Sequence, residues 1–285
     1  MMGKQKWGVR FIVGYLLLLL ILTVFAQVVT SFDPQAVGLS SILQPPNAVH
    51  LFGTDELGRD VLTRLLYGGR VSLAVGLAAM LISVVIGAGY GAVSGFVRGI
   101  IDRVMMRVLD TLISIPSILL MIGIQVLLPR NLVTVVLVIG LTSWMPIARL
   151  IRAEILSLKG EIFIQASAVV GASPLQLLTR HLLPQCLPTI TVMSISGVSH
   201  AILAEATLSF LGLGIPPHEP SWGNMLTGVQ NYLLSGVWWI ALFPGLLITL
   251  TVLAVTFLGD ILQDRFVLPQ LRKGGRAFGG SSINS

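Results

Sequence analysis

The stretch from Val71 to Val97, VSLAVGLAAMLISVVIGAGYGAVSGFV, contains no charged side chain. A helix needs about 20 apolar residues to cross a lipid bilayer, so this segment is long enough to span one. Small side chains recur along it at every fourth position and therefore share one helix face. Such a face lets another helix backbone approach closely. The four small residues are Ser83, Gly87, Gly91 and Gly95. They either form a packing seam or only reflect the high glycine content common in membrane helices.

Further segments of the chain have the same length and apolar character. The chain has 285 residues and is 54% hydrophobic and 11% charged, whereas soluble domains carry about 25% charged residues. We therefore expect an all-α, polytopic membrane protein. Six transmembrane helices are predicted, at residues 11–31, 71–97, 108–128, 131–150, 187–211 and 237–259.

The first apolar segment follows Lys4, Lys6 and Arg10, as the apolar region of a signal peptide would. It continues without a charge from Phe11 to Phe32 and lacks a clean small-residue cleavage site, which favours an uncleaved anchor. We therefore predict an N-terminal transmembrane anchor helix at 1–32, an external loop at 33–70, a core transmembrane domain at 71–267 and a cytoplasmic tail at 268–285.

Basic residues set the predicted orientation, because cytoplasmic loops of membrane proteins carry an excess of Lys and Arg. With the N-terminus in the cytoplasm, only four of the 18 Lys and Arg residues lie outside, namely Arg59, Arg64, Arg70 and Arg130. Both termini are then cytoplasmic. The net charge of +6 comes from scattered residues rather than a long basic run, so we expect contact with the lipid bilayer and none with nucleic acid.

The stretch IQASAVVGASPLQLLTRHLLPQCLP, from Ile164 to Pro188, lies on the predicted cytoplasmic side. Gly171 interrupts a helical pattern, Ser173 is a good N-cap, and Pro174 suits the first helical position. We expect a helix, a bend, and a short helix that Pro184 stops. A short apolar helix lies on lipid or docks into a groove of a partner. Docking is favoured because Arg180 is its one strongly basic residue.

This stretch resembles the EAA loop of ABC importer permeases, E-A-A-x3-G-x9-I-x-L-P, with the spacing kept. Gln165, Ser167 and His181 replace the usual Glu, Ala and Ile. Gln165 removes a carboxylate that relatives offer to their ATPase. The resemblance implies a coupling loop at about 160–184, with contact candidates Gln165, Ala166, Ser167, Gly171, Ser173, Pro174, Leu177, Leu178, His181, Leu183 and Pro184.

Three other stretches resemble the C-type membrane subunit of dipeptide, oligopeptide and nickel importers. They are FGTDELGRDVLTRLLYGGRVSL (52–73), EATLSFLGLGIPPHEPSWGNML (205–226) and LFPGLLITLTVLAVTFLGDILQD (242–264). The resemblance implies the type I ABC importer permease fold, with cytoplasmic coupling helices. It further implies half of a translocation pathway for peptides or for nickel and metal chelates, in a bacterial or archaeal cytoplasmic membrane.

The same resemblance implies the partners. They are a homologous second permease subunit in a heterodimer, two ABC ATPase subunits and an extracytoplasmic solute-binding protein. The chain lacks the G-x-x-x-x-G-K-[ST] phosphate loop. We therefore expect no cofactor and no catalytic residue in this chain, with ATP and Mg²⁺ bound by the ATPase subunits.

Charged residues suggest two further sites. Asp55, Glu56, Arg59 and Asp60 either help to seat the binding protein or pair locally, as Asp55 with Arg59. Glu205 and His200 lie in the fifth predicted span and are translocation or gating candidates, because ionisable groups inside a membrane are costly. Trp222 suits an interfacial anchor. The histidines lie at different predicted depths, so no metal site is expected.

Two alternative functions are a secondary transporter and an intramembrane serine protease. A secondary transporter fits poorly, because such proteins usually show inverted repeats and buried coupling charges. An intramembrane serine protease rests only on Ser194, Ser196 and His200 in one span. A catalytic serine needs a base within hydrogen-bond reach.

Overall fold

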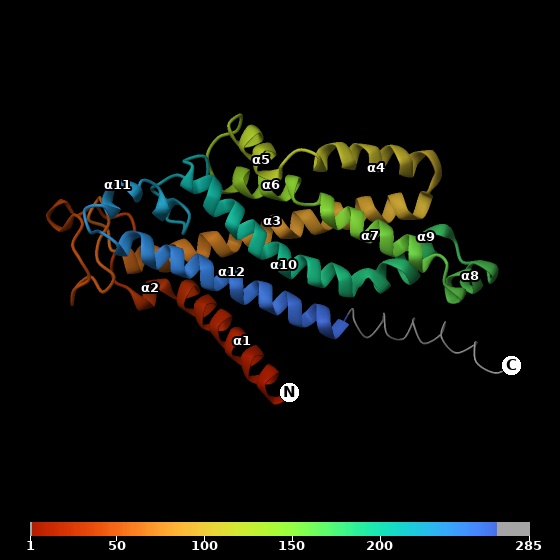
Figure 1. Ribbon diagram of the computed structural model, residues 1–285, viewed down its shortest axis with the longest axis horizontal. Helices are drawn as coiled ribbons and strands as arrows, with labels where there is room; N and C mark the ends of the chain where they lie inside the picture. Colours follow the sequence, from red (N-terminus) through yellow and green to blue (C-terminus); the bar gives the residue numbers. More distant parts are fainter. Residues whose placement is uncertain (1, 267–285) are drawn as a thin grey trace. The chain divides into compact units, whose positions relative to one another are not determined.

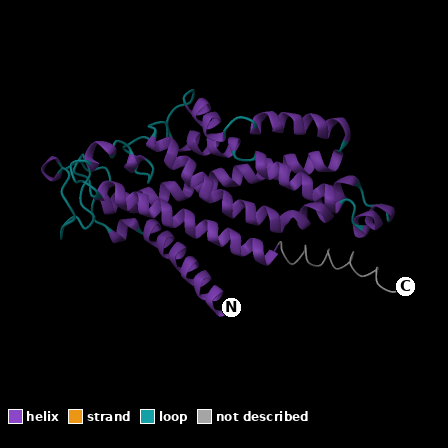
Figure 2. Cartoon of the chain, in the orientation of Figure 1, coloured by secondary structure: helices purple, strands orange, loops and turns teal. Residues whose placement is uncertain are grey.

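The computed structural model describes residues 2–266, and the predicted cytoplasmic tail at 268–285 lies outside them. These residues form helices and loops (Figure 1), and Figure 2 draws no strand among them. The all-α prediction is confirmed. The chain divides into two compact units, which are described separately. Among the described residues, unit 1 comprises 2–82, 116–143 and 197–255, and unit 2 comprises 83–115, 144–196 and 256–266.

The long helices are α1 (Met2–Val24), α3 (Val61–Val97), α10 (Leu183–Phe210) and α12 (Trp239–Phe266). The helices of intermediate length are α4 (Gly99–Ile113), α5 (Ser117–Gln125), α6 (Leu132–Thr142), α7 (Met145–Leu158) and α8 (Ile162–Val169). Short turns complete the set: α2 (Ala26–Val29), η1 (Leu39–Ser41), α9 (Pro174–Gln176), η2 (Leu177–Leu182), η3 (Asn224–Leu226) and α11 (Gln230–Leu233).

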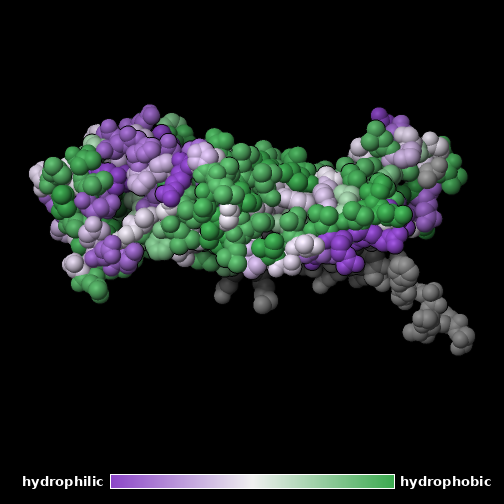
Figure 3. Space-filling model, turned by 90° about the horizontal axis from the view of Figure 1, so that it is seen from above, coloured by the Kyte–Doolittle hydropathy of each residue, from purple (hydrophilic) through white to green (hydrophobic). Residues whose placement is uncertain are grey.

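Four helical segments among the described residues are long and apolar enough to cross a membrane: Val61–Val97, Leu132–Leu158, Pro174–Phe210 and Trp239–Asp264. A fifth results if α4 and α5 count as one bent span, and Gly8–Val24 in α1 is apolar but shorter. Hydrophobic side chains cover much of the face drawn in Figure 3, as lipid-facing helices require. The predicted total of six transmembrane helices stays a prediction.

The predicted third span, 108–128, was wrong as a single helix. Instead α4 and α5 meet at a bend of 83°. Pro116 causes the break, because it has no backbone N–H to donate and disfavours helical backbone at Ile115 before it. The predicted opening of the next helix is confirmed: the Asn131 side chain accepts a hydrogen bond from the Thr134 N–H at 2.9 Å. The helix pair α6 and α7 then extends to Leu158.

Helix α3 begins at Val61 rather than at residue 71, so residues 61–70 are helical and not loop. The Asp60 carboxylate starts the helix early by accepting hydrogen bonds from the Thr63 N–H at 2.8 Å and the Thr63 hydroxyl at 2.7 Å. An acidic group at this end also interacts favourably with the helix dipole.

Trp222 lies in the core of unit 1 and is fully buried. It packs in a cluster with Leu65, Ile202 and Trp239, and its indole N–H donates to the Leu65 carbonyl at 2.9 Å. The expected role as an interfacial anchor was wrong. The indole finds a backbone acceptor inside the protein, which removes the need for a place at the lipid surface.

In unit 2, the stripe of small residues on α3 packs directly on α7. A Cβ at Gly87 would lie 2.7 Å from the Trp144 carbonyl oxygen, and one at Gly91 would strike the Ala148 carbonyl. Contacts this short leave no room for a side chain. The stripe is therefore a packing seam.

Candidate functional site

The segment 160–184 contains a helix, a glycine turn and a second, capped helix. Helix α8 ends at Val169, and Gly171 then adopts φ +96°. This positive φ strains any residue with a side chain, which explains the glycine. A Cβ at Gly171 would meet no atom within 4 Å, so the constraint lies in the backbone and not in crowding. The predicted bend is confirmed.

The second helix starts as predicted, with Ser173 as its N-cap. The Ser173 hydroxyl accepts from the Gln176 N–H at 3.3 Å, and the Gln176 side chain accepts from the Ser173 N–H at 2.9 Å. This reciprocal arrangement is a capping box. Pro174 occupies the first helical position, where no N–H is needed.

Pro184 does not stop this helix, which corrects the prediction. Segment η2 is a π-helical turn, and the Leu183 N–H donates five residues back to the Leu178 carbonyl. The wider turn accommodates the proline ring, which would clash with a carbonyl four residues back in a regular α-helix. The chain continues into α10, so Pro174–Phe210 forms one candidate span.

Apolar side chains of this segment lie on the surface. Val170 is 89% exposed and Leu175 69% exposed, and Ile162 and Val169 are exposed as well. In contrast, Leu182 is fully buried and anchors the segment. Leu177, Leu178, His181 and Leu183 are partly buried, whereas Ala166 and Pro184 are exposed. Exposed apolar side chains grouped in this way mark a contact surface for lipid or for a protein.

The two polar residues at the E-A-A positions, Gln165 and Ser167, form side-chain hydrogen bonds with backbone carbonyls earlier in the same segment. The Gln165 side chain donates to the Gly160 carbonyl at 3.2 Å, and the Ser167 hydroxyl donates to the Phe163 carbonyl at 2.8 Å. The Ser167 bond lies within α8, whereas the Gln165 bond reaches the turn before this helix. Position 165 therefore offers a neutral amide and no carboxylate.

Lys159 lies beside this segment and was not among the predicted site residues. Its ammonium donates to the Phe96 carbonyl at 2.7 Å and lies over the Phe96 ring, 4.7 Å from its centroid. The last carbonyls of a helix lack partners, so this contact closes the end of α3. Burial, and to a lesser extent the charge of Arg98, lowers the pKa of Lys159. The sequence offers one indication of this role, namely that Lys159 directly precedes the segment 160–184.

Glu205 is fully buried in unit 1, within a set of hydroxyl groups. It accepts from the Ser72 hydroxyl at 3.0 Å and from the Ser209 hydroxyl at 2.8 Å. The Ser72 hydroxyl oxygen also accepts a hydrogen bond from the backbone N–H of Trp222 at 3.2 Å. His200 is exposed, so the structure does not bring the two candidates together. The hydroxyl groups compensate for the cost of burying Glu205, and its gating role stays a prediction.

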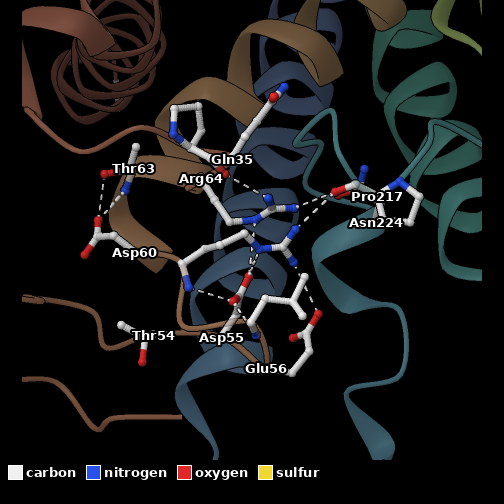
Figure 4. Close-up of polar contacts among 12 residues, drawn as sticks. Gln35, Thr54, Asp55, Glu56, Asp60, Thr63, Arg64, Pro217 and Asn224 are labelled. Carbon is white, nitrogen blue, oxygen red and sulfur yellow. Dashed lines mark hydrogen bonds and ion pairs between the residues drawn. The ribbon is translucent and has the colours of Figure 1, made fainter. Parts of the chain in front are cut away.

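The charged residues at 55–60 pair with each other and with backbone (Figure 4). Asp55 binds Arg59 at 2.7 Å, and Arg59 reaches Glu56 at 3.3 Å. Asp60 contacts His50 at 3.0 Å while it caps α3. The interpretation as local pairing is confirmed, and Glu56 keeps the most exposed side chain of the four. Contact with a binding protein stays a prediction.

Arg64 completes this cluster and was not among the predicted residues. Its guanidinium lies 3.5 Å from Asp55 and donates to the Pro34 carbonyl at 3.0 Å and the Pro217 carbonyl at 3.2 Å. Arg59 also donates to Pro217, at 3.4 Å. The two buried arginines thus attach the loops around Pro34 and Pro217 to α3, beside a cavity of about 110 Å³.

No group of three His, Cys, Asp or Glu among residues 2–266 is placed to hold a metal ion. Cys186 is fully buried, as expected for a small apolar filler.

Comparison with known proteins adds three kinds of likeness. The family model described as "Binding-protein-dependent transport system inner membrane component" matches residues 87–268. A putative peptide transport system permease protein of Brucella abortus is 41% identical over 269 residues, covering 93% of this chain and 89% of that protein. The dipeptide transport system permease protein DppC of Bacillus subtilis is 41% identical over 261 residues, covering 90% and 81%.

DppC of Escherichia coli is 41% identical over 267 residues, covering 92% of this chain and 89% of that protein. Among solved structures, the MetNI methionine ABC transporter in an inward-facing conformation is similar, with a TM-score of 0.54 and 20% identity over 69% of this chain and 94% of that one. At this identity the likeness concerns the fold alone.

Proposed function

This chain belongs to the family of binding-protein-dependent transport system inner membrane components, as a permease subunit of an ABC importer, and we propose that its cargo is peptides. Relatives at 41% identity that span most of both chains are named for peptide or dipeptide transport. Nickel and metal chelates are not named among them. Uptake of a labelled dipeptide by cells that carry the complete importer tests this. Nickel uptake with no dipeptide uptake would contradict it.

The protease alternative finds no support in the geometry. The Ser194 hydroxyl donates to the Ile190 carbonyl at 2.7 Å, and His200 is exposed on the same helix. Serine activation needs a hydrogen-bonded base. The secondary transporter is likewise not favoured, because the family works with a binding protein.

We propose that the segment 160–184 docks to the ATPase subunits and couples their closure to alternating access. The observation that supports this is the exposed apolar surface held beside the Gly171 turn and the Ser173 cap. An amphipathic helix that meets a groove uses such apolar anchors. Leu175, at 69% exposure, is a better anchor than the half-buried Leu177 of the sequence prediction.

The complete importer would contain this chain, a homologous second permease, two ATPase subunits and an external solute-binding protein. ATP and Mg²⁺ belong to the ATPase subunits, and this chain catalyses no covalent step. The family description supports a binding protein and a place in the inner membrane. Both termini are proposed to lie in the cytoplasm. A cysteine at the exposed His218 should react with an impermeant thiol reagent from outside, and one at Leu175 should not.

The coupling proposal is tested with Gly171→Leu in the purified complex. The strained backbone should displace the capped helix, so peptide-stimulated ATP hydrolysis and transport should fall while membrane insertion persists. Gly160→Leu is the matched control. It lies in the same segment, has no positive φ and meets only an ordinary contact of 3.4 Å with the Ser157 carbonyl.

A crosslinking experiment tests the docking surface directly. With Cys186 replaced by alanine, a cysteine at Leu175 should crosslink to the ATPase subunit, and one at the exposed Val49 should not. Wild-type coupling in Gly171→Leu, together with no crosslink from residues 173–180, would replace docking by the lipid-lying interpretation.

A further inference from the structure

In unit 2, helices α4 and α7 line an open groove of about 600 Å³. Its charged lining comes from both helices, and its apolar lining comes from α4 alone. The groove lies apart from the segment 160–184 in sequence, and none of its residues belongs to the proposed docking surface. The lining residues are Asp102, Arg103, Arg107, Asp110, Arg152 and, on the apolar side, Ile100, Val104 and Met106.

The acidic residues of the groove are already paired with α7. Arg152 binds Asp102 through two hydrogen bonds of 2.6 and 2.7 Å, and Arg149 pairs with Asp110. Arg103 and Arg107 are exposed, and their guanidinium groups make no hydrogen bond or ion pair with any residue from 2 to 266. Two guanidinium groups therefore face the groove with their donors free and without a compensating carboxylate.

The free arginines stand beside an aliphatic row on α4. Arg103 and Arg107 are four residues apart, and so are Ile100, Val104 and Val108 in turn. Residues three and four apart are neighbours on a helix surface, so the two rows run side by side. The aliphatic side chains are 70%, 58% and 50% exposed, respectively. One helix thus presents a cationic row next to an apolar row.

We propose that this groove binds an anionic phospholipid. The phosphate would accept hydrogen bonds from Arg103 and Arg107, whose planar guanidinium groups match phosphate oxygens, and an acyl chain would lie along Ile100, Val104 and Val108. Basic pockets between the helices of membrane proteins bind anionic headgroups in this way. A soluble anion would use the arginines but gain nothing from the aliphatic row.

The residues of α4 favour a position of this helix at the level of the lipid headgroups. The helix has charged groups beside an apolar face, the combination found in helices that lie in the membrane interface. At Pro116 the chain bends by 83° into the uncharged α5. A helix with these charges is costly at the bilayer centre, whereas in the interface its arginines reach lipid phosphates.

The experiment uses the full-length chain in nanodiscs of phosphatidylcholine with a small fraction of phosphatidylglycerol. Native mass spectrometry counts the retained phosphatidylglycerol. We expect enrichment over phosphatidylcholine, and about 30-fold weaker binding for the Arg103→Gln/Arg107→Gln double variant, because each arginine near a lipid surface contributes by charge attraction. Arg130→Gln, which removes another exposed arginine, should bind like the wild type.

Further arms separate the other outcomes. Equal retention of the two lipids, or unchanged binding by the double variant, overturns the proposal. Displacement of phosphatidylglycerol by inorganic phosphate or by glycerol phosphate at comparable affinity also overturns it, since the groove is then a soluble-anion site. If the double variant does not fold, Val104→Asn takes its place. It should weaken lipid binding and leave the binding of glycerol phosphate unchanged, and an equal loss of both ligands would count against the lipid.

Discussion

The loop cluster around Asp55 and the segment 160–184 keep their shape in opposite ways. In the loop cluster, buried Arg59 and Arg64 meet a buried carboxylate and carbonyls from distant loops. In the segment 160–184, one glycine turn and one capping box set the backbone, and apolar side chains stay on the surface. A region that satisfies its own polar groups needs no partner, whereas a region with exposed apolar side chains gains by acquiring one.

The two sets of candidate contact residues differ in how accessible their side chains are. Three of the four charged candidates at 55–60 are largely buried in internal pairs, so a contact with a binding protein at that loop narrows to Glu56. The candidates in the segment 160–184 remain accessible at Ala166, Pro184 and the neighbouring Leu175. The segment is therefore the stronger candidate for a protein contact.

The largest expected effect is that of Asp55→Asn. Removal of this carboxylate leaves the buried Arg64 without an acidic partner and Arg59 with only the partly exposed Glu56, which should lower the free energy of unfolding by about 3–5 kcal/mol. Denaturant unfolding of the purified chain measures it. Glu56→Gln is the control and should cost less than about 1 kcal/mol, because that pair is partly exposed. A small loss in Asp55→Asn would show that the cluster does not depend on its own charges.

Gly91→Leu should have the next largest effect. The segment 160–184 follows α7, and α7 packs on the glycine stripe of α3, so the segment depends on this seam. The leucine side chain has no space beside the Ala148 carbonyl, and such overpacking costs about 1–3 kcal/mol. Gly89→Leu is the matched control on the same helix, with no atom within 4 Å of its Cβ. Equal unfolding midpoints for the two variants would contradict the seam.

Ser173→Ala should have the smallest effect. It removes the N-cap of the second helix, at a cost of about 1 kcal/mol that is confined to the first turn. Hydrogen exchange at the Gln176 amide should speed up, and peptide-stimulated ATP hydrolysis should fall in part. Ser167→Ala serves as control, because that hydroxyl bonds within α8 and caps nothing. No change in exchange at Gln176 would mean that a partner, and not the cap, orders this helix.

Features governed by local chemistry could be predicted from the sequence. The Gly171 turn, the Ser173 cap and the start of α6 at Asn131 each depend on residues within one helical turn. The apolar runs likewise predicted an all-helical membrane protein. In the candidate site, the positions of the bend and of the cap followed from residue types alone.

Features that depend on distant groups could not be predicted. Arg64 and Lys159 find their acceptors at Pro217 and Phe96, far away in the sequence. Trp222 meets the Leu65 carbonyl in the same way. The number of apolar residues over 108–128 gives no sign of the bend at Pro116. A proline usually ends a helix, but Pro184 does not, because η2 widens the turn just before it.

The π-helical turn η2 also acts as a phase shifter. A regular helix advances about 100° per residue, and a turn closed five residues back holds roughly one residue more than an α-helical turn. Side chains before η2 are therefore rotated relative to those after it by about the width of one helix face. A helical wheel drawn without interruption through residues 174–196 assigns the wrong faces on one side of the turn. The insertion lets a single rod of helix turn Leu175 outward while Leu182 and Cys186 stay buried.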